Sequence, residues 1–152
     1  MNPSINDIES YIKAKGLGNV VVYTAGSATY DNALYTTDYI DTLGYGSIVF
    51  ACNYTVSLAS GESFTVPGTI QHSADTTLAS FTAVDTLHLG TLTASGAALV
   101  ATTGALANGY NLNRCKRYVR FVARPDLSAA GTDTAVVAYT AIVGGAQVLP
   151  AT

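Results

Sequence analysis

The chain has 152 residues, of which 49% are hydrophobic and 11% are charged, and its formal net charge is −3. This length predicts one domain with a sizeable core, and high hydrophobicity with few charges excludes an intrinsically disordered chain. The longest apolar stretch is interrupted by Gly and Thr and is too short to cross a bilayer, so we expect no membrane partner. So little charge is typical of a protein that packs against copies of itself or a larger assembly.

The N-terminus lacks a basic segment followed by an apolar one, so we expect no secretory signal and synthesis in a cytoplasm. Residues 1–13 predict a short helix, with Ser4 as a candidate N-cap and isoleucines at helical spacing. We therefore divide the chain into an N-terminal helix or arm, residues 1–16, and a single β-domain, residues 19–152, with an extended C-terminal tail.

The rest of the chain predicts β-structure. Residues 47–58 are the clearest strand, because a large apolar residue stands at every second position, as on a strand with one buried face. A turn at 60–63 leads into a strand at 64–73, in which Pro67 indicates a bulge or an edge. Further strands are expected at 19–24, 79–84, 86–93, 97–102, 114–124 and 133–143, with turns at 107–109 and 128–133. Many short strands and turns predict an all-β fold: an antiparallel sandwich, a jelly roll or a barrel.

Five of the seven Lys and Arg residues fall within residues 114–124, which we call the cationic segment. On a strand, Arg117 would share the apolar face of Cys115 and would need a carboxylate partner or a route to solvent. The opposite face would present side chains about 7 Å apart. Its candidate interface residues are Arg114, Lys116, Tyr118, Arg120 and Arg124.

Three partners are open for these cations: carboxylates of neighbouring strands, another protein, or a nucleic acid. The candidate carboxylates are Asp38, Asp41, Asp75 and Asp85. A nucleic acid is disfavoured, because the rest of the chain is acidic and no known binding motif occurs. We expect the segment to face protein and no nucleic acid to bind.

Nothing in the sequence predicts an enzyme, a metal or a cofactor. The two histidines, His72 and His88, lie in predicted strands with no convergent nucleophile or acid. The spacing of Asp31, Asp38 and Asp41 matches no standard calcium loop, so we expect a solvated turn.

The two cysteines are too few for a disulfide framework or a zinc site. Cys52 and Cys115 both fall in phase with large apolar residues, and synthesis in a cytoplasm disfavours a disulfide. We expect two reduced, inward-facing thiols of one β-core, on adjacent strands. The ten tyrosines, with no tryptophan, offer amphipathic area for subunit contacts or for a sugar site.

Three segments in order resemble a family of small virion proteins of tailed bacteriophages, regarded as head decoration or cement proteins. They read "YIDTLGYGSIVF" (39–50), "TIQHSADTTLASFTAV" (69–84) and "CKRYVRFVAR" (115–124), followed by a closing strand and a Pro-containing tail. The residues that fit the family pattern are Asp41, Thr42, Gly44 and Tyr45, then Ile70, Gln71, Ser73, Asp75 and Phe81, then Lys116 to Arg120. The match covers about residues 39–151.

The resemblance implies a β-rich homotrimer on the capsid exterior that binds the major capsid protein and clamps neighbouring capsid subunits. Two features depart from the family pattern: Cys115 stands where relatives have a small residue, and residues 90–109 are richer in Ala, Gly and Thr. The alternatives are a tail or head–tail junction component, and a module that binds host glycans through exposed tyrosines.

Overall fold

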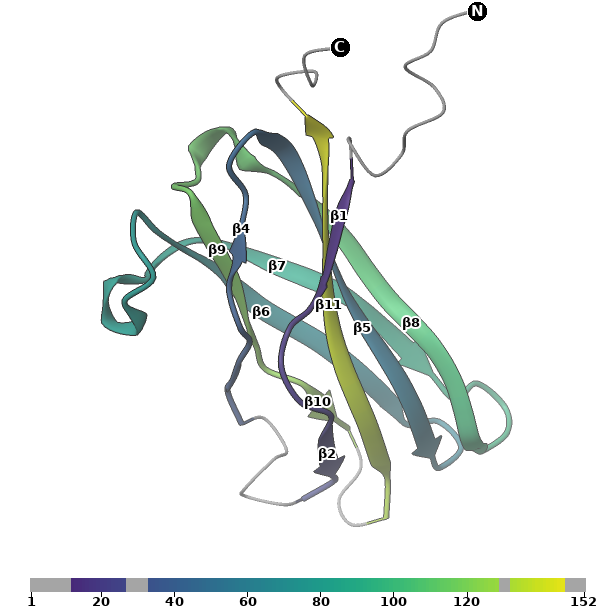
Figure 1. The fold of residues 1–152 in the computed structure, drawn as a ribbon. Helices are drawn as coiled ribbons and strands as arrows, with labels where there is room; N and C mark the ends of the chain where they lie inside the picture. Colours follow the sequence, from purple (N-terminus) through teal and green to yellow (C-terminus); the bar gives the residue numbers. More distant parts are fainter. Residues whose placement is uncertain (1–11, 27–32, 129–131, 147–152) are drawn as a thin grey trace, which may run out of the picture.

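The computed structural model describes residues 12–26, 33–128 and 132–146, which fold almost entirely as antiparallel strands (Figure 1). The strands are β1 (Lys13–Gly16), β2 (Val21–Thr24), β3 (Tyr35–Thr36), β4 (Ile40–Asp41), β5 (Tyr45–Leu58), β6 (Ser63–Ser73), β7 (Thr82–Thr93), β8 (Leu99–Asn111), β9 (Tyr118–Ala123), β10 (Asp126–Leu127) and β11 (Thr134–Ala146). Two short 3-10 helices, η3 (Leu78–Ser80) and η4 (Leu112–Arg114), join strands.

The strands form two sheets. Sheet A has the order β1-β11-β5-β8, with β2 also paired to β11. Sheet B has the order β10-β6-β9-β3, with β4 paired to β9 and β7 paired to β6. The rings of Phe50 from β5 and Phe121 from β9 stack between the sheets, with centroids 5.4 Å apart. The expected all-β, antiparallel architecture is confirmed, and of the three forms left open the two facing sheets correspond to a sandwich.

Along the long strands, the side chains at every second position point between the two sheets and fill the core. The inner residues of β5 are buried, except for the partly buried Tyr54, as the period of two in residues 47–58 predicts. The central strand β11 contributes small and β-branched residues with one aromatic ring, Tyr139, which is 3% exposed. Their burial supplies the main free energy that holds the two sheets together.

Several predicted boundaries are corrected. The residues expected to form a turn at 107–109 lie inside β8, and the strands expected at 79–84 and 86–93 form one strand, β7, after η3. The turn at 60–63 is confirmed, because β5 ends at Leu58 and β6 begins at Ser63. A register shift beside Pro67 confirms the expected bulge.

The predicted N-terminal helix falls largely on residues 1–11, which lie outside the described part of the chain. Lys13–Gly16 form strand β1, paired with β11, in place of a helix end. At the other end, the first residues of the expected tail continue β11 to Ala146.

Candidate functional site

The cationic segment does not form one continuous strand. The Asn111 side chain accepts a hydrogen bond from Asn113 N (2.9 Å), and Cys115 N donates to Leu112 O (2.8 Å), which closes the helical turn η4. Strand β9 begins only at Tyr118. The first four residues of the segment therefore belong to a turn at one end of the sandwich, and the strict alternation expected for 114–124 is wrong there.

Arg117 is held by a carboxylate of residues 39–50, the first of the three segments on which the resemblance rests. Its Nε lies 3.0 Å from Asp41 Oδ1 and its Nη2 lies 2.7 Å from Asp41 Oδ2, a bidentate ion pair. The hydrogen bonds from Arg117 lower the pKa of Asp41. Thr42 adds a second attachment, because its Oγ1 donates to Arg117 O over 2.7 Å. Of the two outcomes expected for Arg117, a partner or a route to solvent, both occur, because it pairs with Asp41 while its side chain is 46% exposed.

Arg120 is held by residues of the second motif. Its Nε donates to Gln71 Oε1 (2.8 Å), and its guanidinium carbon lies 4.3 Å from the ring centroid of Phe81. Burial lowers the pKa of Arg120. The three motif segments therefore meet at one end of the sandwich, and Arg117 and Arg120 connect them within the chain.

Aromatic rings continue this arrangement. Tyr118 meets Tyr39 edge-on with centroids 5.5 Å apart, and Tyr39 stacks on Phe81 at 5.9 Å. The Lys15 ammonium donates to Tyr39 O (2.6 Å) and lies 5.2 Å from the Tyr39 ring centroid. A hollow of about 490 Å³ separates Lys15 from Arg120.

Other cations of the segment point to solvent. Arg114, Lys116 and Arg124 are exposed. Within the described residues, the side chains of Arg114 and Lys116 have no hydrogen-bond or ion-pair partner, whereas Arg124 is tied by its main-chain N to Pro67 O (2.8 Å). The predicted set thus divides into two residues used within the fold, Tyr118 and Arg120, and three at the surface.

The thiols differ in burial. Cys52 on β5 is fully buried, and burial raises its pKa to about 12. Cys115 is half-buried against the core, with a pKa that burial also raises. Both are free, but the adjacent-strand prediction is wrong, because Cys52 lies in sheet A and Cys115 precedes the first residue of β9 in sheet B.

Residues 12–26, 33–128 and 132–146 contain no group of three or more His, Cys, Asp or Glu side chains that could hold a metal ion. His72 Nδ1 accepts from Lys116 N (3.2 Å), and its pKa is lowered by burial and by the Lys116 charge. His88 Nε2 lies 3.4 Å from Thr91 Oγ1. Of the three aspartates weighed as calcium ligands, Asp31 lies outside the described residues and Asp41 is paired with Arg117. No helix in the described ranges has the length and apolarity needed to cross a bilayer.

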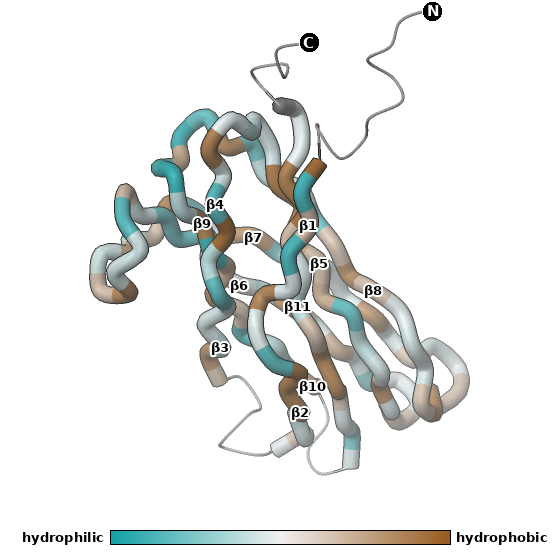
Figure 2. Tube along the Cα trace, viewed as in Figure 1, coloured by the Kyte–Doolittle hydropathy of each residue, from teal (hydrophilic) through white to brown (hydrophobic). Residues whose placement is uncertain are grey.

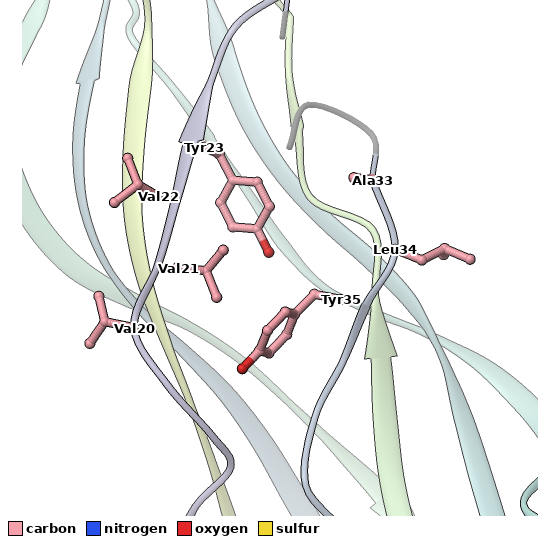
Figure 3. A pocket seen from close by; sticks show the side chains of 7 residues that line it. All are labelled: Val20, Val21, Val22, Tyr23, Ala33, Leu34 and Tyr35. Atoms are coloured by element: carbon pink, nitrogen blue, oxygen red, sulfur yellow. The ribbon is translucent and has the colours of Figure 1, made fainter. Parts of the chain in front are cut away.

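A pocket of about 450 Å³ lies between β2 and the segment leading into β3. Figure 3 shows Tyr23 and Tyr35 directed into it, whereas Val20 and Val22 point to the other side of β2. Burial raises the pKa of Tyr23 to about 12, so its hydroxyl stays protonated at neutral pH. Because residues 27–32, which join the two walls, lie outside the described chain, we assign no ligand to this pocket.

Sequence reasoning missed a second surface, the outer face of sheet A. Its outward positions on β5, β8 and β11 carry only apolar, small, hydroxyl or amide side chains. Val136 lies beside Val22, and Ile142 lies beside Val49, with exposed fractions of 39%, 52%, 39% and 38%. Figure 2 shows β11 in white and brown, whereas teal gathers near β4 and β9. The outward residues of 47–57 were visible in the sequence, but the strands that pair with them were not.

No family model and no curated protein matches the chain. Two solved structures share the fold: the VP2 subviral particle of infectious bursal disease virus (TM-score 0.51, 10% identity) and the T13 particle of the same virus (TM-score 0.51, 11% identity). The matches cover 91% and 92% of this chain but only 34% and 33% of those chains. At such low identity they show a common fold alone.

Proposed function

We propose that this protein is a structural component of a tailed-phage virion. It binds the outer surface of the capsid and stabilises it by clamping neighbouring capsid subunits, as a homotrimer. The observation that carries the proposal is the β-sandwich itself, which is similar over 91% of the chain to VP2 of a subviral particle. A fold does not determine a function, so the proposal also rests on the surface chemistry and on the motif resemblance.

The meeting of the three motif segments supports the resemblance to phage decoration proteins. Asp41 with Arg117, and Gln71 with Arg120, hold together segments that lie far apart in the sequence. Such contacts give a physical reason why these residues would occur together in one family. They also assign Arg117 and Arg120 a role in the fold, which leaves the side chains of Arg114 and Lys116 for a partner.

We assign the capsid contact to the cationic segment, with Arg114, Lys116 and Arg124 in direct contact and Tyr118 and Arg120 supporting them. The exposed guanidinium and ammonium groups can pair with carboxylates of a capsid subunit and steer its approach. An outer position also keeps these cations away from the packaged genome, so no nucleic acid is involved.

The test is binding to undecorated capsids of the phage that encodes the protein, followed by cryo-electron microscopy. Density for the chain on the outer shell, across the junction of capsid subunits, is the expected result. Density at the tail or the head–tail junction would replace the proposal with that alternative, and an absence of binding would contradict it. A glycan array with clear, specific signals would favour the host-glycan module instead.

Charge reversal distinguishes a specific contact of these cations with the capsid from non-specific adhesion of the protein. The double variant Arg114→Glu and Lys116→Glu should bind capsids at least about tenfold more weakly, and the difference should shrink at high salt because the charges are screened. The matched control is Lys13→Glu, an exposed lysine at the start of β1, which should bind like the parent protein. Tight binding to labelled DNA with a steep dependence on salt would count against the outer-shell assignment.

A further inference from the structure

The outer face of sheet A offers a wide surface without ionisable side chains. Its exposed large apolar residues include Val22, Val49, Val136 and Ile142, and the outward positions between them are Ala, Gly, Ser, Thr or Asn. None of these outward side chains is buried by other described residues. A neighbour that covered this face would remove apolar area from water without burying a charge, which is favourable.

Strand β8 forms the free edge of this sheet. It has thirteen residues, contains neither a charge nor a proline, and among the described strands pairs only with β5. Soluble proteins commonly protect such edges by shortness, Lys or Pro. The opposite edge follows this rule, because β1 has four residues and two of them, Lys13 and Lys15, are lysines. β8 has none of these three protections, although its pairing with β5 is interrupted by a register shift between Val56 and Leu58.

The register shows which main-chain groups of β8 are free. A residue in an antiparallel strand turns its N–H and C=O to one side, and the next residue turns them to the other side. Leu17 N donates to Tyr139 O (2.9 Å), so the main-chain groups of Tyr139 turn toward the β1 side of β11. Cys52 lies opposite Tyr139 on β5, so the main-chain groups of Cys52 turn toward β8, where they meet those of Leu106.

The residues that flank Leu106 consequently turn away from β5. The main-chain groups of Thr103, Ala105 and Ala107 have no hydrogen-bond partner within the described chain, and all three residues are exposed. Their side chains are small and lie on the outer face. Nothing in this row prevents the close approach of another backbone.

We propose that the outer face of sheet A, together with the β8 edge, is the surface on which copies of this chain associate. The occupant is a second copy because that copy offers the same surface. Two such surfaces can meet without burying any ionisable group, whereas the charged end of the sandwich would bury unpaired cations. The exposed side chains of Arg114 and Lys116 remain available for a different partner. This inference deepens the self-association in the proposed function, but it does not depend on the capsid.

The experiment measures the molar mass of the full chain in solution by light scattering after gel filtration. In the test variants, Val136→Lys puts a charge at the centre of the face and Ala107→Lys puts one at the edge. Both side chains can reach solvent in a monomer but would be buried and unpaired in the contact. The controls are Val136→Thr, which keeps the shape without a charge, and Thr86→Lys at an exposed position of β7 in sheet B. Circular dichroism checks that each variant is folded.

The expected result is an oligomer for the parent protein and both controls, with a dissociation constant raised at least about tenfold by each test variant. A monomeric parent protein would overturn the inference, and so would an oligomer that the two lysines leave unchanged. A dimer that the lysines disperse would support the surface while contradicting the homotrimer. If the lysine variants dissociate the oligomer but the parent protein does not bind capsids, the proposed function is rejected and this inference still holds.

Discussion

Asp41 and Arg117 form a bidentate ion pair between β4 and the turn before β9, with Arg117 Nη2 2.7 Å from Asp41 Oδ2. The partners are 76 positions apart in the sequence. The side chains are 32% and 46% exposed, so solvent screens the pair and its contribution to stability is small. Its main effect is to fix how the turn enters β9, and thereby the position of the cations that precede this strand.

Replacement of Asp41 should make stability less dependent on acid. Because the pKa of Asp41 is lower in the folded chain than in the unfolded chain, the pair stabilises the fold above the ordinary carboxyl pKa of about 4 and loses this effect as pH falls through the folded-state pKa. Asp41→Asn should therefore be slightly less stable than the parent at pH 7, and the difference should vanish near pH 2. Urea unfolding at one protein concentration measures this, with Asp38→Asn as the control. A difference that is equal at both pH values would contradict the argument.

Arg120 should matter for stability more than the exposed cations do. Arg120→Ala removes the hydrogen bond to Gln71 and the contact with the Phe81 ring, and should lower the free energy of unfolding by about 1–2 kcal/mol. Arg120→Lys should lose part of this, because an ammonium cannot reproduce the planar contact. Arg114→Ala should change stability little. A loss for Arg120→Ala as small as that for Arg114→Ala would contradict the structural role of Arg120.

The sequence predicted those parts of the fold that depend on local pattern. Alternation in residues 47–58 identified β5 and its buried face, and Asp41 was among the carboxylates expected to meet the cations. The turn predicted at residues 107–109 was wrong, because Asn and Gly favour turns locally. In the structure they are held extended by the register with β5, a long-range pairing that local propensity does not contain.

The candidate site was predictable only in part, for the same reason. Clustering of cations along the chain was visible, but the division between paired and exposed cations depends on Gln71 and Phe81, which no spacing rule connects to Arg120. To recognise the uncharged face of sheet A, one must know the order of the strands, in which β11 lies between β1 and β5. Strand order arises from packing of the whole chain, so no single segment could reveal it.

Gly68 should tolerate no side chain. A Cβ there would lie 2.3 Å from Phe121 Cζ and 2.6 Å from Val122 O. Because the backbone oxygen cannot move aside, Gly68→Ala should destabilise the fold by about 2 kcal/mol or more. The matched control is Gly16→Ala, where a Cβ would meet nothing within 4 Å. Thermal unfolding compares the two, and a Gly68→Ala variant as stable as the control would contradict the close approach.

The two thiols should react in two separate steps. The half-buried Cys115 should react slowly with an aromatic disulfide reagent in the folded protein, whereas Cys52, with its pKa raised to about 12, should react only after unfolding. Cys115→Ser should remove the slow native-state reaction and leave one thiol that requires denaturant. A cross-link between Cys52 and Cys115, seen by mass before reduction, would contradict the separation of the two residues between sheets.

Amide hydrogen exchange should distinguish the two sides of β8. In the monomeric Ala107→Lys variant, the amide of Ala105 should exchange fast because its N–H has no partner, and the amide of Leu106 should exchange slowly because it faces β5. In the parent oligomer, covering the edge should slow Ala105 at least about tenfold and change Leu106 much less. An Ala105 amide that exchanges equally fast in both proteins would show that the copies leave the β8 edge in water, and would restrict their contact to the face around Val136.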